Sequence, residues 1–175
     1  MRLIVPAFLL LATVTASAQT PYAGMQTRPI KALSDQQVSD LNAGRGMGLA
    51  LAAELNGYPG PSHVLELGEK LELSSDQRSR VQGLFDSMKA EAQPLGSKLI
   101  VLEADLDKLF ASRAITPDSL KASTAAIASL QGELRETHLK YHLSTAAILT
   151  PVQMARYAEL RGYGKDAPMQ HQHRH

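Results

Sequence analysis

The chain reads LSSDQ at residues 73–77 and LTPVQ at residues 149–153. In each motif the serine or threonine after the leucine can accept a hydrogen bond from an early helical N–H. The glutamine three residues later can reach back to the N–H of that capping residue, which completes a capping box. Each motif therefore predicts the start of a helix. The motif residues are Leu73, Ser74, Gln77, Leu149, Thr150 and Gln153.

Two long helices are predicted between and around these motifs. After the first motif, apolar residues recur every seven positions up to Leu109, and the same spacing recurs from Leu120 to Ile148. Such stripes on two stretches joined by a short turn, residues 112–116, predict an antiparallel helical hairpin. Pro94 lies inside the first stretch, but the stripe keeps its phase across it. We therefore expect a bend at Pro94 rather than a break.

Shorter helices are predicted on both sides of the hairpin. Ser34 opens another capping box, and the residues after it predict one helix to about Asn56, which three glycines within residues 44–48 weaken. The segment 56–61 is rich in glycine and proline and predicts a turn.

A short helix over residues 62–71 is expected next, and a last one is expected from the second motif to about Arg161, where Gly162 stops it. Since no stretch alternates like a strand, the predicted fold class is all-α, a long hairpin with short flanking helices.

The N-terminus has the features of a secretory signal peptide. Arg2 precedes an apolar run, residues 3–14, and a small-x-small cleavage site ends at Ala18. The run is shorter than the roughly 18 residues of a membrane-spanning helix, so we expect cleavage and no stable membrane insertion. The sequence thus divides into a signal peptide (1–18), a flexible leader (19–33), a helical domain (34–164) and a disordered, histidine-containing tail (165–175).

Charge and composition exclude several classes of function. The chain has 18 Lys and Arg against 17 Asp and Glu, so no strong field draws it to nucleic acid. The absence of cysteine excludes disulfides, a thiolate nucleophile and a cysteine-based metal site. Carboxylates such as Glu103, Asp105 and Asp107 are expected on the solvated face without forming an acid–base pair, and no hydrolase or phosphate-loop motif is present. We expect a protein that is not an enzyme.

Taken together, a signal peptide, a helical chain without cysteine and a Leu-Ser/Thr-x-x-Gln box at both ends of a hairpin resemble the Spy/CpxP family. Its relatives include ZraP and CnrX-like metal-responsive proteins. The resemblance covers about residues 62–162; the second motif has the family's Leu-Thr-Pro-x-Gln form, and Ser74 in the first keeps the hydroxyl. The resemblance implies a cradle-shaped homodimer in the bacterial periplasm. Members of the family include an ATP-independent chaperone, an inhibitory adaptor of a sensor kinase, and metal-responsive proteins.

Protein binding is the favoured interpretation. Leu139 and Leu143 lie on the side of their helix opposite Tyr141 and Ile148, so a hairpin interface does not need them. Such a surplus apolar face can bind a second copy, an unfolded periplasmic protein or a sensor kinase. Alternatively, the short flanking helices cover it. This function requires no cofactor.

Metal binding is the alternative function. His138 and His142 lie one helical turn apart and can hold one ion, and His63, beside Glu66, adds a ligand if the helices meet. The tail offers a second candidate for chelating Zn, Cu or Ni. For both groups of histidines an ordinary structural role stays open: partial exposure or hydrogen bonds to neighbouring carboxylates such as Glu136 or to backbone for the helical pair, and a solvated polar tail for the others. The tail histidines are His171, His173 and His175.

Overall fold

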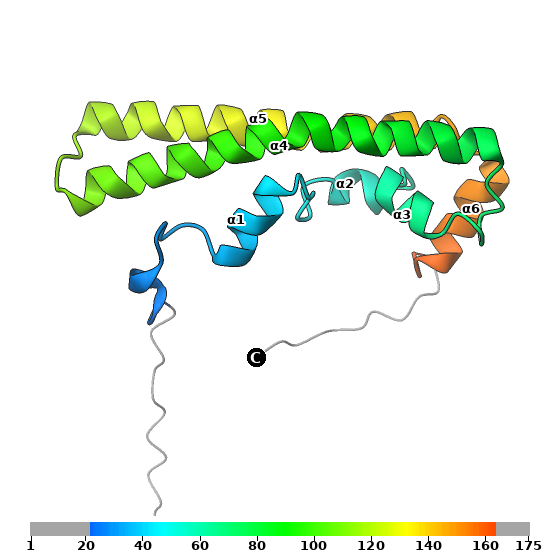
Figure 1. Cartoon of the computed structure of the whole chain (residues 1–175), viewed down its shortest axis with the longest axis horizontal. Helices are drawn as coiled ribbons and strands as arrows, with labels where there is room; N and C mark the ends of the chain where they lie inside the picture. The colour runs from blue at the N-terminus through cyan, green and yellow to red at the C-terminus, as the bar shows by residue number, and fades with distance from the viewer. Residues whose placement is uncertain (1–21, 164–175) are drawn as a thin grey trace, which may run out of the picture.

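The computed structural model describes residues 22–163 (Figure 1). The expected signal peptide and the histidine tail lie outside this range. The described part contains helices and turns but no strand, so the all-α prediction is confirmed there. None of its helices is long and apolar enough to cross a bilayer. The elements are η1 (Met25–Thr27), α1 (Asp35–Asn42), α2 (Leu51–Glu54), α3 (Pro61–Glu66), α4 (Ser75–Ala111), α5 (Pro117–Ala146) and α6 (Pro151–Leu160).

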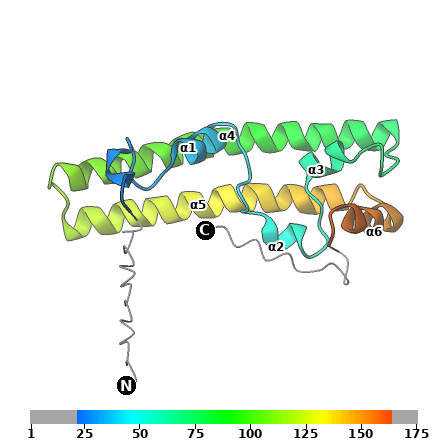
Figure 2. The ribbon, with the colours of Figure 1, turned by 90° about the horizontal axis from the view of Figure 1, so that it is seen from below.

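The two long helices, α4 and α5, lie side by side along their length (Figures 1 and 2). α4 continues through Pro94 without a break. The apolar stripes meet between the helices, although Leu120, near the tip of the pair, is exposed. The main core cluster consists of Leu41, Ala92, Leu99, Ile127, Leu130 and Leu134.

The short helices α1, α2, α3 and α6 all lie on one side of the α4–α5 pair (Figure 1). The view from that side shows α1 over α4, α2 beside α5, and α3 between the two long helices (Figure 2). α1 contacts α4, α2 contacts α5, and α3 contacts both. This one-sided arrangement places the candidate site between the short elements and the hairpin.

The prediction of a single helix from Ser34 to about Asn56 is wrong. α1 ends at Asn42 and α2 begins at Leu51. Between them Gly44, Met47 and Gly48 have φ values of 66°, 43° and 82°. These left-handed conformations cannot continue a right-handed helix, and glycine adopts them without a steric penalty. The helix predicted over residues 62–71 is also shorter than expected: α3 spans Pro61–Glu66.

The end of the expected leader, residues 31–33, lies against α4. The Nζ atom of Lys31 is 3.1 Å from Oδ2 of Asp107, and Leu33 packs on the main core cluster. Of the carboxylates expected on the solvated face of α4, Asp105 is exposed, whereas Glu103 and Asp107 are half-buried. Burial raises the pKa of Glu103.

Capping boxes open four of the helices. In each, the side chain of the capping residue accepts from the backbone N–H three residues later, and that later side chain accepts from the N–H of the capping residue. Both partners lie within one turn, so the starts of these helices depend only on local sequence. The pairs are Ser34 with Gln37, Ser74 with Gln77, Thr116 with Ser119, and Thr150 with Gln153.

The two motif glutamines also bond to each other. The Nε2 atom of Gln77 donates to Oε1 of Gln153 at 2.8 Å, and Nε2 of Gln153 donates to Oε1 of Gln77 at 3.0 Å. Nε2 of Gln77 also donates to the backbone carbonyl of Ile148, and Nε2 of Gln153 also donates to the backbone carbonyl of Leu71. The motifs therefore tie the α3–α4 connection to the α5–α6 connection. Beside them lies a second core cluster, Val64, Leu71, Val81, Leu149 and Tyr157.

Candidate functional site

A cavity of about 500 Å³ lies between the hairpin and the loop–α2–α3 segment that covers it. The loop over residues 43–50 forms one wall, α2 and α3 form another, and α4 and α5 form the floor. The lining combines three imidazoles and one carboxylate with apolar side chains. Its residues include His63, His138, His142, Glu54, Met47, Met88, Phe85 and Pro61, with Arg45 and Lys89 also present.

His138 is buried in α5 without a partner. Only 2% of the residue is exposed, and its Nε2 atom is the one buried side-chain nitrogen or oxygen between residues 22 and 163 that lacks a hydrogen bond. Burial, and then the nearby charge of His142, lower the pKa of His138. The imidazole is therefore kept neutral. Since an unpaired buried polar atom costs free energy, Nε2 of His138 is a candidate to bind a water molecule or another ligand.

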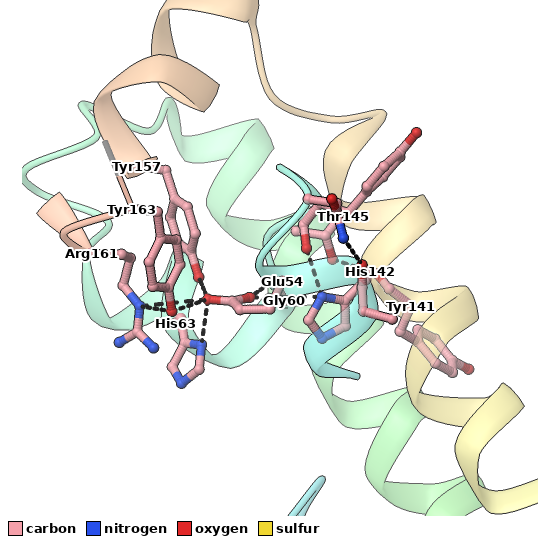
Figure 3. A network of polar contacts seen from close by, with 12 residues as sticks. Glu54, Gly60, His63, Tyr141, His142, Thr145, Tyr157, Arg161 and Tyr163 are labelled. Atoms are coloured by element: carbon pink, nitrogen blue, oxygen red, sulfur yellow. Dashed lines mark hydrogen bonds and ion pairs between the residues drawn. The ribbon is translucent and has the colours of Figure 1, made fainter. Parts of the chain in front are cut away.

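His142 lies one turn further along α5 and is held in a fixed orientation (Figure 3). Its Nδ1 atom is 2.7 Å from the carbonyl oxygen of Tyr58. Because a carbonyl only accepts, we assign the ring proton to Nδ1, which leaves a lone pair on Nε2. A Cβ atom on Gly60 would lie 2.7 Å from that Nε2, so only glycine lets the ring pack here. A backbone carbonyl that orients an imidazole in this way is the usual support of a metal-binding histidine.

Glu54 joins α2, α3 and α6 through hydrogen bonds to its buried carboxylate (Figure 3). Oε1 accepts from the hydroxyls of Tyr157, at 2.5 Å, and Tyr163, at 3.1 Å. Oε2 accepts from the N–H of Gly60 at 3.2 Å. These donors satisfy both carboxylate oxygens in the interior, so the ends of three separate elements are fixed on one side chain.

Two basic side chains lie next to the same carboxylate. The Nδ1 atom of His63 lies 3.4 Å from Oε1 of Glu54, and Nε of Arg161 lies 3.5 Å from it. Burial alone would raise the pKa of Glu54, but the hydrogen bonds from His63 and Tyr157 and the charge of His63 lower it to about 2. Burial and the bond to Glu54 raise the pKa of Tyr157. Glu54 is therefore ionised and the tyrosine is a hydrogen-bond donor at every ordinary pH.

His63 of α3 and His138 and His142 of α5 all line one cavity. His63 faces Glu54 rather than Glu66, whose carboxylate accepts from Ser62. His142 bonds to backbone, not to Glu136. Within residues 22–163, however, no three His, Asp or Glu side chains converge closely enough to hold an ion. Among the described residues, His138 and His142 therefore have no third such side chain close enough to share an ion with them.

The other candidate residues lie apart from this cavity or outside the described range. Leu139 is half-buried and Leu143 is 57% exposed on α5. The tail histidines, His171, His173 and His175, lie outside the described residues.

Sequence reasoning missed Glu54 and its two tyrosine donors. One signal was present: Glu54 is the only charged residue in the apolar stretch 49–55. A lone carboxylate in such a stretch is either exposed or specifically paired when buried. Nothing local indicated that Tyr157 and Tyr163 would be its partners.

No family model, curated protein or solved structure matches the chain. The resemblance to the Spy/CpxP family stays a prediction that rests on the signal peptide, the cysteine-free helical chain and the two motifs.

Proposed function

We propose that the protein is exported to the periplasm and binds a transition-metal ion, Zn, Cu or Ni, through His138 and His142. One observation carries this proposal: the Nε2 of His138 is buried without a partner. One turn away, the Nδ1 of His142 lies 2.7 Å from the Tyr58 carbonyl, and the tautomer assigned from that contact leaves its Nε2 as a candidate ligand atom. Both line the same cavity. Imidazole nitrogen is a suitable ligand for all three metals.

The surroundings of the two histidines favour metal over a proton. Metal and proton compete for the same nitrogen, so a histidine of lowered pKa remains available to metal at lower pH. Burial lowers the pKa of His138 in this way. The carbonyl of Tyr58 and the close contact with Gly60 hold His142 in place, which reduces the ordering that binding requires.

The full chain is expected to bind Zn²⁺, Cu²⁺ or Ni²⁺ in calorimetric titrations, and His138→Ala with His142→Ala should weaken that binding strongly. Loss of a group that only supports a ligand typically costs about 10–100-fold in affinity, so loss of both imidazoles should cost at least as much. Glu136→Ala, an exposed change on the same helix, is the matched control and should leave the affinity unchanged.

Circular dichroism of the metal-free double variant establishes that it is folded. A folded double variant that binds metal at the cavity as tightly as the parent would contradict the proposal.

Protein binding is the second candidate, supported by apolar side chains exposed around α2 and the adjoining part of α5. Leu51, Leu55, Tyr58 and Leu143 are all exposed there. α2 contacts α5, and the Tyr58 carbonyl touches His142, the neighbour of Leu143. Exposed apolar groups of this kind mark interaction sites. The surface suits an unfolded client, a sensor kinase or the second copy of a homodimer.

If this surface binds clients, an equimolar amount of the protein should suppress aggregation of an unfolding client without ATP, as followed by light scattering. The activity should persist in EDTA, because apolar contact needs no metal. Leu55→Asp with Leu143→Asp should weaken it by placing charge on the surface. Val101→Asp, as exposed as Leu143 but on α4, is the control. If Val101→Asp weakens the suppression of aggregation as much as Leu55→Asp with Leu143→Asp does, this surface is not the client-binding site.

A further inference from the structure

We infer that the ion in this cavity is copper(I), and that the thioether sulfurs of Met47 and Met88 bind it together with the imidazoles of His138 and His142. This inference rests on the proposed metal binding and names the ion and two further ligands. All four side chains line the same cavity. Two neutral imidazoles and two thioethers form an uncharged ligand set, unlike the carboxylate-containing sets that suit harder ions.

Met88 lines the cavity from α4, close to the level of His142. The hydroxyl of Tyr141 donates to Glu91, and this bond marks the register of α5 against α4. Met88 lies three residues before Glu91, and His142 lies one residue after Tyr141. In this antiparallel pair the two are therefore offset by about two residues, or about 3 Å along the axis. Met88 is only 7% exposed, so its side chain is enclosed at the floor of the cavity.

Met47 lines the cavity from the loop that covers it, close to His138. It follows Gly46, where a Cβ atom would lie 3.5 Å from Nδ1 of His138, so the loop backbone packs on that imidazole. Met47 is partly exposed at this wall. A methionine side chain has three rotatable bonds, so its sulfur can move to meet an ion without a shift of the backbone. The two sulfurs thus approach the histidine pair from opposite walls.

Thioether sulfur selects copper(I) among the ions that imidazole accepts. Soft sulfur ligands favour Cu(I), whereas zinc in proteins is bound by thiolate, imidazole and carboxylate. Imidazole alone suits Zn, Cu and Ni alike, so the histidines do not discriminate between them. The two methionines therefore give this cavity its preference.

The charge of the cavity favours the same ion. Its lining carries Arg45 and Lys89 against one carboxylate, Glu54. Both oxygens of Glu54 already accept hydrogen bonds from protein groups. Copper(I) adds one positive charge to these surroundings, whereas Zn²⁺ or Ni²⁺ adds two. Because the free-energy cost of burying an ion rises with its charge, the apolar walls also favour the monovalent ion.

The test measures the affinity of the full chain for Cu(I) and for Zn²⁺ separately, each by chelator competition, with Cu(I) kept reduced by ascorbate under nitrogen. Met47→Leu with Met88→Leu removes both sulfurs but keeps apolar side chains of similar volume. We expect a loss of Cu(I) affinity of about tenfold or more, because even the loss of a group that supports a ligand costs that much. The Zn²⁺ affinity should stay unchanged, since both imidazoles remain. Met154→Leu, a half-buried change on α6 beside the second core cluster, is the matched control and should alter neither affinity.

X-ray absorption at the copper edge gives a second readout that does not depend on the variants. The spectrum of the Cu(I)-loaded parent should show both sulfur and nitrogen bound to copper. The spectrum of the double methionine variant should show nitrogen without sulfur. Circular dichroism of the metal-free variants establishes that they are folded. If the double variant does not fold, the spectrum of the parent decides, and a parent without copper-bound sulfur overturns the inference.

The outcomes separate this inference from the proposed function. If the double methionine variant binds Cu(I) as tightly as the parent, or loses Cu(I) and Zn²⁺ affinity equally, the sulfurs are not ligands. The inference then fails, while metal binding by the imidazoles stands. If His138→Ala with His142→Ala binds both ions like the parent, the proposed function fails as well.

Discussion

Replacing Glu54 with alanine is expected to lower the free energy of unfolding by about 3–5 kcal/mol, the typical cost of removing one partner from a buried charged network. The variant leaves the Gly60 N–H and the Tyr157 hydroxyl without their acceptor in the interior. It also removes the negative charge that faces His63 and Arg161. Urea denaturation followed by far-UV circular dichroism measures the change. Because Glu54 links α2, α3 and α6, the substitution should first loosen the packing of these three helices against α4 and α5.

Two further variants separate burial from charge. Glu91 also accepts from a tyrosine, Tyr141, and pairs with Lys140, but it is exposed. Glu91→Ala should therefore cost less than about 1 kcal/mol. Glu54→Gln keeps an acceptor for Tyr157 and loses the charge, so its cost should fall between the two. Equal losses for Glu54→Ala and Glu91→Ala would refute the central role of the buried carboxylate.

Acid is expected to destabilise the metal-free protein in two stages. Burial and the charge of His142 lower the pKa of His138 below 6.5, so the unfolded chain takes up this proton first. The stability contributed by neutral His138 is present above about pH 6.5 and is lost as the pH falls below it. For Glu54 the pKa is about 2 in the folded state against 4.5 in the unfolded chain. Its contribution, about 3 kcal/mol, is present above pH 4.5 and is lost toward pH 2.

Chemical denaturation at a series of pH values between 8 and 3, in the presence of a chelator, measures both stages. His138→Gln should flatten the upper stage and leave the lower one. Glu54→Gln should reduce the lower stage and leave the upper one. If both variants keep the slopes of the parent at all pH values, other groups control the acid response.

The regular part of the fold follows closely from the sequence. The starts of α4, α5 and α6 depend on capping bonds between residues three apart, which sequence spacing reveals directly. The buried positions of the long helices, such as Val81, Leu99 and Leu134, follow from the sevenfold apolar stripes. The prediction of one continuous helix failed between α1 and α2. There the positive φ angles of the glycine-rich loop interrupt the helix, although the apolar pattern continues.

The sequence alone therefore determined the long helices and the role of each motif as a helix start, because those features depend on neighbours in the chain. The bonds between the two motif glutamines join residues 76 positions apart and depend on the tertiary structure. Only the tertiary structure decided the candidate site. The hydroxyls that bond to Glu54 come from residues 103 and 109 positions further along the chain, and the carbonyl that orients His142 comes from 84 positions before it. Burial of Glu54 and of His138 exists only after α2 and α3 have packed against the hairpin. A buried polar group gains its role from donors that the packing supplies, and no local spacing specifies them.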